Sequence, residues 1–242
     1  MHEFAIHTPL VDSWPSLPPT LQLLNDHVIV HRLRKVLRLE AGAQVILFGV
    51  KHAFRCRIIS YEKEKSVQLQ PIEQQPVTPP QPDVQLYLPL LERPAFEEAI
   101  RAATVLGITT IRPFRSDKTK RHDCSTSERE RLQRIMIAAA EQSKQFHLPP
   151  IAPEEELATI LPTLQESIYF DAQGDFGAHE LVALQTTSPI SVIFGPEGDF
   201  TDEEKTQLKA QGISSYRLTN SILRSEDAVM VGIGLLRTLL RS

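Results

Sequence analysis

The part of the chain after residue 84 alternates short apolar runs with helical patterns, and this alternation constrains the fold most. The runs are rich in β-branched and aromatic residues, which is typical of buried strands. Predicted strands cover residues 84–90, 109–113, 168–170, 191–194 and 214–218, and predicted helices cover 94–106, 125–145 and 229–240. Such alternation indicates a mostly parallel sheet with helices on both faces. We therefore expect an α/β domain over residues 84–242.

One predicted strand, ending at Phe194, stops abruptly at a Gly-Pro turn. Thr201 and Glu204 then have the spacing of a capping box, which predicts a helix directly after the turn. Open α/β sheets bind ligands in loops of this kind, and the glycines allow a ligand close to the backbone. The acidic Glu197 and Asp199 disfavour a polyphosphate and favour a neutral or cationic small molecule. The same residues are equally compatible with a tight connection that binds nothing.

A second unusual loop, residues 218–228, leads into the C-terminal helical segment 229–240. This segment is apolar nearly all round, so we expect it to be buried. A monomer offers a terminal helix few surfaces for such burial. A subunit interface, and hence a homodimer, is the expected cover.

The first 72 residues differ from the rest in charge and pattern. They carry nine Lys and Arg against six Asp and Glu, whereas the remaining 170 residues carry 17 against 24. Short β-type runs at 45–48, 54–60 and 66–69 predict a small β-rich domain. Five prolines between positions 71 and 82 indicate a semi-rigid linker, which we place at 73–83.

Two basic stretches are candidates for contact with nucleic acid. The helical pattern at 31–39 carries Arg32, Arg34, Lys35 and Arg38, and the polar loop after the second α/β strand carries Arg115, Lys118, Lys120 and Arg121. An isolated basic helix is commonly just a solvated face. Arg55 and Arg57 on a neighbouring strand favour instead a surface that holds phosphates without reading sequence.

Composition excludes several classes of protein. No apolar run approaches membrane-spanning length, and residues 1–20 lack the pattern of a secretory signal. Cys56 and Cys124 are too few for a disulfide framework or a metal cluster, and the eight histidines lack ligand spacing. We therefore expect reduced thiols, no metal and a cytoplasmic location.

Two motifs carry a resemblance to a known family. Phe-Gly-Pro-Glu-Gly at 194–198 and Ile-Leu-Arg-Ser-Glu-Asp-Ala at 222–228 resemble the ribosomal RNA small subunit methyltransferase E family of the SPOUT superfamily. Residues 31–42, 138–143 and 149–151 agree with it as well. The resemblance is collinear over nearly the whole chain.

The resemblance implies an N-terminal PUA-like β-barrel over residues 1–72 and a C-terminal α/β domain with a deep trefoil knot over 84–242. It also implies a homodimer that binds S-adenosylmethionine in the knot and methylates N3 of a uridine in 16S ribosomal RNA of the small subunit. The cofactor-binding residues that it implies are Phe194, Gly195, Pro196, Glu197, Gly198, Leu218, Ser221, Ile222 and Leu223.

The implied reaction assigns roles to two further residues. Uridine N3–H is a weak acid, so its methylation needs a base or stabilisation of the developing imide anion. Arg224 is expected to face a uracil carbonyl, and Glu226 to orient Arg224 or to accept a proton. The alternative role for Arg224 is a structural salt bridge to Glu226 or Glu197.

Several positions depart from the family pattern. They are Asp199, Thr219, Ser221, Asp227 and the pair Lys144-Gln145. Ser221 and Gln145 replace arginines expected to contact RNA, so the target is less constrained than the cofactor. Open alternatives are a diverged SPOUT protein that binds RNA without methylating it, a methyltransferase for another RNA nucleotide, and an α/β enzyme with a nucleotide substrate.

Overall fold

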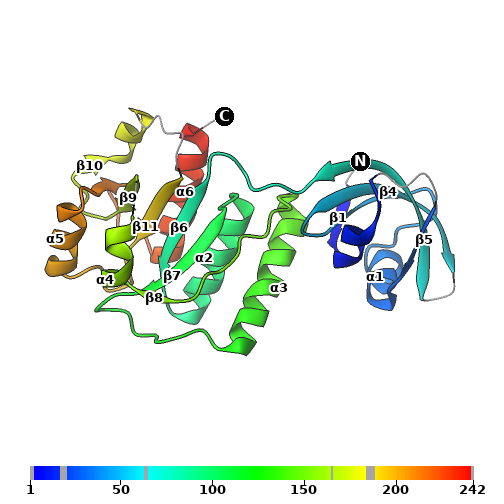
Figure 1. Ribbon diagram of the computed structural model, residues 1–242, viewed down its shortest axis with the longest axis horizontal. Coiled ribbons are helices and arrows are strands. Elements are labelled where there is room, and N and C mark those ends of the chain that lie inside the picture. The colour runs from blue at the N-terminus through cyan, green and yellow to red at the C-terminus, as the bar shows by residue number, and fades with distance from the viewer. Residues whose placement is uncertain (1–2, 17–20, 63–64, 165, 184–188, 241–242) are drawn as a thin grey trace. The chain divides into compact units, whose positions relative to one another are not determined.

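The computed structural model describes residues 3–16, 21–62, 65–164, 166–183 and 189–240 (Figure 1). The chain divides into two compact units. The first comprises residues 1–78 and 140–147, and the second comprises residues 79–139 and 148–242. The sequence pattern did not indicate that residues 140–147 belong with the first unit.

The first unit is built on a five-stranded sheet in the order β1-β3-β4-β5-β2. Its strands are β1 Phe4–His7, β2 Gln22–Asn25, β3 Gln44–Phe48, β4 His52–Glu62 and β5 Ser66–Pro76. β1 pairs with β3 in parallel, and the other neighbours are antiparallel. A 3₁₀ turn spans Pro9–Ser13. Ile6, Leu33, Phe54 and Leu69 are fully buried in the core of this unit, and the three predicted strands are confirmed.

The basic helix of the first unit begins earlier than its spacing indicated. α1 spans His27–His31 and continues as a π-helical turn over Arg32–Val36. The Asp26 carboxylate caps it by accepting hydrogen bonds from two backbone N–H groups, at 2.9 and 3.2 Å. Arg38 then has a positive φ of 54°, a left-handed conformation that helices do not contain.

The proline-rich stretch assigned to a linker is partly a strand. β5 pairs with β4 as far as Pro76, opposite His52, and the division between the units falls after Thr78. β2 pairs with β5 along Ser66–Leu69. Pro71 and Pro76 lie beyond that pairing, where β5 has β4 on one side, and an edge tolerates the missing N–H of proline.

The second unit contains a seven-stranded sheet in the order β10-β12-β9-β11-β6-β7-β8, and every described pairing in it is parallel. Its strands are β6 Val84–Pro89, β7 Thr110–Arg115, β8 Glu155–Glu156, β9 Ser167–Phe170, β10 Phe176–Gly177, β11 Ile190–Phe194 and β12 Ser214–Arg217. Its helices are α2 Arg93–Val105, α3 Thr126–Ser143, α4 Leu157–Ile160, α5 Asp202–Ala210 and α6 Ser225–Leu239, with 3₁₀ turns at Leu161–Thr163 and Ala178–Ala183. The predicted α/β architecture with a parallel sheet is confirmed.

Alternate residues of the central strands enter two separate cores, as strand geometry requires. Val192 and Phe194 of β11 pack in the core that contains side chains of α2, α3 and α6. Ile193, between them, packs in the core that contains side chains of α4 and α5. Helices therefore cover both faces of the sheet (Figure 1).

The C-terminal helix α6 is buried on one face within the chain itself. Val229, Ile233 and Leu236 are fully buried against the sheet and α2, whereas Met230 and Val231 remain 42% and 43% exposed. A Cβ on Gly232 would lie 2.8 Å from the Phe170 ring, so glycine is required there. A subunit interface was the expected cover for this helix, but α2 and the sheet of the same chain supply much of the cover.

Candidate active site

The carboxyl ends of three neighbouring strands define the candidate site. β12, β9 and β11 are adjacent and parallel, so the loops that follow them leave the same edge of the sheet. Those loops begin at Asp171, Gly195 and Leu218. This edge is where open parallel sheets bind ligands.

A small cavity of about 50 Å³ opens at this edge. That volume is below the roughly 300–1,000 Å³ typical of small-molecule sites. Its lining comes from the ends of β9 and β12 and the start of α6: Phe170, Asp171, Ala172, Leu218, Thr219, Ser221, Leu223 and Ala228. Three of the predicted cofactor residues, Leu218, Ser221 and Leu223, thus line it, whereas Ile222 is 89% exposed. The contribution of β9 was missed, although a predicted parallel strand should have drawn attention to its carboxyl end.

The loop after β11 has a defined backbone conformation. Phe194 is buried, with its ring centroid 5.3 Å from that of Phe170, and Pro196 is buried as well. Asp199 has a φ of 58°, and its N–H donates to the Pro196 carbonyl at 2.8 Å. A left-handed residue other than glycine costs roughly 1–2 kcal/mol, less for aspartate, whose side chain bonds locally. Here that carboxylate accepts from the Phe200 N–H at 2.7 Å.

Contacts from neighbouring segments hold this loop in place. The Glu197 carboxylate accepts from the Glu92 N–H at 2.7 Å. The Lys118 ammonium donates to the carbonyls of Gly198 and Phe200, at 2.9 and 3.2 Å. The predicted capping box is confirmed, since the Thr201 hydroxyl and the Glu204 carboxylate each accept from the other's backbone N–H.

Asp171 places a buried negative charge beside the cavity. Burial raises the pKa of its carboxyl, but bonds from the Gln173 N–H, the Tyr169 hydroxyl and Lys205, at 2.9, 2.7 and 2.9 Å, outweigh it and lower the pKa overall. Burial and the same carboxylate raise the pKa of Tyr169. Asp171 is therefore ionised at neutral pH, Tyr169 is a neutral donor, and the Lys205 ammonium matches the charge of the carboxylate.

The two predicted catalytic residues lie at the start of α6. Arg224 is the N-cap residue and is exposed, and Glu226 lies in the first helical turn. Among the described residues, no ion pair joins Arg224 to Glu226 or Glu197. The guanidinium is therefore not held by the structural salt bridge that the sequence left open.

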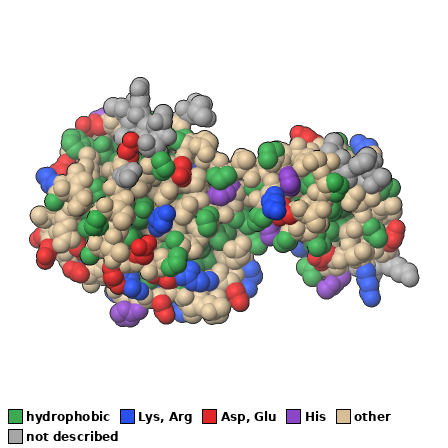
Figure 2. Space-filling model, in the orientation of Figure 1, with side chains coloured by type: hydrophobic (Ala, Val, Ile, Leu, Met, Phe, Trp, Pro, Cys, Tyr) green, Lys and Arg blue, Asp and Glu red, His purple; other side chains and the backbone are tan. Residues whose placement is uncertain are grey.

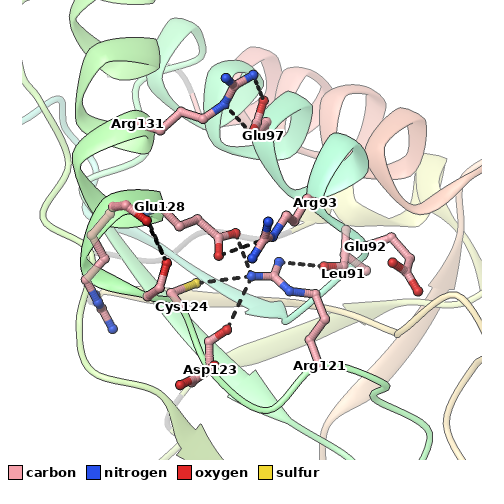
Figure 3. A network of polar contacts seen from close by, with 12 residues as sticks. Leu91, Glu92, Arg93, Glu97, Arg121, Asp123, Cys124, Glu128 and Arg131 are labelled. Carbon is pink, nitrogen blue, oxygen red and sulfur yellow. Dashed lines mark hydrogen bonds and ion pairs between the residues drawn. The ribbon is translucent and has the colours of Figure 1, made fainter.

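The basic loop after β7 is largely committed to contacts within the protein (Figure 3). The Arg121 guanidinium donates to the Glu128 carboxylate at 2.5 Å and to the Leu91 carbonyl at 2.7 Å, and it lies 5.4 Å from the centroid of the Phe96 ring. Arg115 pairs with Glu156 at 2.6 Å. These residues therefore do not present free charges for RNA in this structure.

In the basic segment of the first unit, some charges are matched by acidic side chains and others are not. Arg32 makes a bidentate contact with Glu141, at 2.6 and 2.9 Å, so its charge is matched. Arg34 stacks over the Tyr61 ring, 5.7 Å from its centroid. A hollow beside α1 is lined by His27, Val30, His31, Arg34, Lys35 and Lys65. Arg38 is exposed nearby in sequence, after the π-helical turn.

The described residues contain neither a membrane-crossing helix nor a metal cluster. No described helix combines the length and apolar character needed to span a bilayer. Nor do the described His, Cys, Asp and Glu side chains gather in threes where a metal ion could bind.

Acidic side chains are prominent near α5, whose first turn carries Asp202, Glu203 and Glu204 (Figure 2).

The fold and the site define a class of protein. The family model of the RNA methyltransferase domain matches residues 78–237, and the chain belongs to this family. Two similar relatives are both named ribosomal RNA small subunit methyltransferase E. The one from Synechocystis is 29% identical, with 88% of this chain and 72% of the relative covered. The one from Aquifex aeolicus is 26% identical, with 84% and 88% covered.

Solved structures show the same fold over both units. The ribosomal RNA small subunit methyltransferase E of Neisseria gonorrhoeae, bound to S-adenosylmethionine, has a TM-score of 0.79 and 24% identity, with 98% of each chain covered. A Legionella pneumophila protein in complex with the same cofactor has a TM-score of 0.77 and 21% identity, also with 98% of each chain covered.

Proposed function

We propose that this chain is an S-adenosylmethionine-dependent methyltransferase that modifies N3 of a uridine in 16S ribosomal RNA. The observation that carries the proposal is the cavity at the ends of β9 and β12. Its walls include Leu218, Ser221 and Leu223 of the loop 218–228, and β11, which leads into the first motif, is the neighbour of β9 in the sheet. The family match and the names of both relatives support methylation of small subunit ribosomal RNA.

The residues around the cavity fit the proposed cofactor. When bound, S-adenosylmethionine supplies a methyl group on a positively charged sulfonium. Leu218 and Leu223 offer apolar walls for an adenine ring, and Thr219 and Ser221 add hydroxyl groups to the lining. The backbone of residues 195–198 provides further donors and acceptors.

The residues at the start of α6 account for the proposed proton chemistry. As N3 gains a methyl group it loses a proton, and negative charge develops on the uracil carbonyl oxygens. The exposed Arg224 guanidinium donates hydrogen bonds to one of those oxygens and stabilises the charge. Glu226, in the first turn of the helix, orients Arg224 or accepts the N3 proton. The target base must be unpaired for this, since N3 lies on its Watson–Crick edge.

The first unit supplies the proposed RNA-binding surface. We assign it to Arg34, Lys35 and Arg38, whose charges are not matched by an acidic partner among the described residues. The finer features implied by the resemblance belong to the same proposal: a PUA-like barrel in the first unit, a trefoil knot in the second, and a homodimer formed by exposed α6 residues such as Met230 and Val231. Such a dimer, acting on ribosomal RNA in the cytoplasm, would scatter light as twice the 27.3 kDa chain mass.

Two measurements test the activity. Calorimetry should show binding of S-adenosylmethionine, and mass spectrometry of nucleosides from a strain lacking the gene should show loss of one 3-methyluridine from 16S ribosomal RNA. The wild-type gene should restore that nucleoside. Loss of a different methylated nucleoside would keep the cofactor and change the target, as the departures at Ser221 and Gln145 allow. An unchanged nucleoside profile would leave only RNA binding.

A further inference from the structure

Lys118 lies against the loop that follows β11. Its ammonium donates to the Gly198 carbonyl at 2.9 Å and to the Phe200 carbonyl at 3.2 Å. Its aliphatic chain covers Gly198, where an added Cβ would lie 3.3 Å from the Lys118 Cδ. Two of the three N–H groups of the ammonium, and the flank of the side chain, are thus used within the protein.

The segment that carries Lys118 is itself fixed at several points. The Asp117 N–H donates to the Glu204 carboxylate at 2.9 Å, and the Ser116 N–H donates to the Thr119 hydroxyl at 3.0 Å. Arg121 anchors the far end of the same loop through Glu128 and the Leu91 carbonyl (Figure 3). Lys118 is therefore presented from a firm base, as a positioning contact requires.

The loop that receives these contacts is exposed at residues 197–199, and Asp199 holds a left-handed backbone conformation. Within the loop, the Asp199 N–H donates to the Pro196 carbonyl and the Asp199 carboxylate accepts from the Phe200 N–H. From other segments, the Glu92 N–H donates to the Glu197 carboxylate, and the Lys205 ammonium pairs with Asp199 at 2.7 Å. Among the described side chains, Lys118 is the one that donates to the carbonyls of Gly198 and Phe200.

We infer that Lys118 is a positioning residue for the cofactor, and that it sets cofactor affinity rather than RNA affinity. This inference rests on the proposed function. By fixing the Gly198 and Phe200 carbonyls, the ammonium holds the intervening backbone in one conformation. Without it the loop samples other conformations, and the apparent affinity falls with the fraction that remains competent to bind.

The experiment compares the full-length variants Lys118→Met, Lys118→Arg and Lys120→Met. Methionine keeps the aliphatic cover over Gly198 and removes both hydrogen bonds. Lys120 is the matched control, because it lies in the same loop and makes only a 3.8 Å contact with Glu92. Calorimetry with S-adenosylmethionine should show about ten-fold weaker binding for Lys118→Met, partial recovery for Lys118→Arg and no change for Lys120→Met. Filter binding of RNA should be unchanged in all three.

A second measurement needs no cofactor. In Lys118→Met, backbone amides of residues 198–201 should exchange with deuterium faster than in the wild type, whereas exchange in β11 and α5 should not change. Unchanged exchange together with unchanged cofactor affinity would overturn the inference, and so would weaker RNA binding at normal cofactor affinity. Failure of the wild type to bind S-adenosylmethionine would instead reject the proposed function, while the exchange data would still report on Lys118.

Discussion

Replacing Arg121 by alanine should destabilise the second unit rather than weaken RNA binding. The side chains of Arg121 and Glu128 are 13% and 5% exposed, so the variant leaves the carboxylate buried without its nearest cation. Removing one partner of a buried pair costs about 3–5 kcal/mol. Arg93, whose Nε lies 3.7 Å from Glu128, compensates in part, so we expect roughly 2–3 kcal/mol. For a unit of this size that corresponds to a fall in Tm of about 5–10 °C.

The assay is thermal and urea unfolding, followed by fluorescence, in parallel with RNA filter binding below the Tm. Arg131→Ala is the matched control: Arg131 pairs with Glu97 (Figure 3), but its side chain is 62% exposed, so the Tm should equal that of the wild type. The double variant Arg121→Met/Glu128→Leu should regain stability relative to Arg121→Ala, since neither charge then remains buried. An Arg121→Ala protein that melts like the wild type but binds RNA poorly would refute this reasoning. It would support the contact with RNA that the sequence predicted for Arg121.

Three further predictions concern other residues. Arg224→Ala should bind S-adenosylmethionine normally and methylate RNA about 10²-fold more slowly, and a normal rate would remove Arg224 from the mechanism. Arg34→Ala/Lys35→Ala should flatten the salt dependence of RNA binding, by up to about 0.7 in log–log slope per lost phosphate contact, whereas Arg32→Ala should chiefly lower Tm. Burial raises the pKa of the Cys56 thiol from 9.0 to about 12, so stability should fall as pH rises above about 9, where only the unfolded chain releases this proton. Rapid alkylation of Cys56 in the folded protein at pH 8 would contradict that burial.

The central strands of the second unit could be predicted because the residues on both faces of each strand are mostly apolar. Ile190–Phe194 is buried at every position, which is the pattern of a central parallel strand. The edge strands β8 and β10 were missed because each has only two residues, Glu155–Glu156 and Phe176–Gly177. Two residues are too few to show the alternation of apolar and polar positions that predicts a strand. The extension of β5 through Pro71 and Pro76 was missed for another reason. A cluster of prolines predicts the end of a strand. The sequence does not show that β5 has a free edge at these positions, where proline is tolerated.

The partners of the basic residues could not be predicted from the sequence. Arg121 and Lys118 have the spacing of a basic loop, but their partners Glu128, Leu91 and Gly198 come from other elements, and Gly198 lies 80 positions away. A charge pattern indicates that cations are present, but it does not indicate which groups contact or neutralise them. The unmatched charges in the first unit, the ion pair of Arg121 and the carbonyl contacts of Lys118 become distinguishable only when the tertiary contacts are known.

The departures from the family pattern fall into two kinds, and the difference bears on the target. Asp199 replaces a glycine in the cofactor loop, and its cost is offset locally, because its carboxylate accepts from the Phe200 N–H and pairs with Lys205. Ser221 and Gln145 replace arginines: Ser221 lines the cavity, and Gln145 accepts from the His147 N–H, with Lys144 supplying a cation one position earlier. A compensated change conserves the geometry in which a cofactor binds, whereas a cation lost at Ser221 and displaced at Gln145 changes contacts with phosphate or base. We therefore expect the cofactor to be that of the family, and any divergence of this protein to lie in the RNA that it recognises.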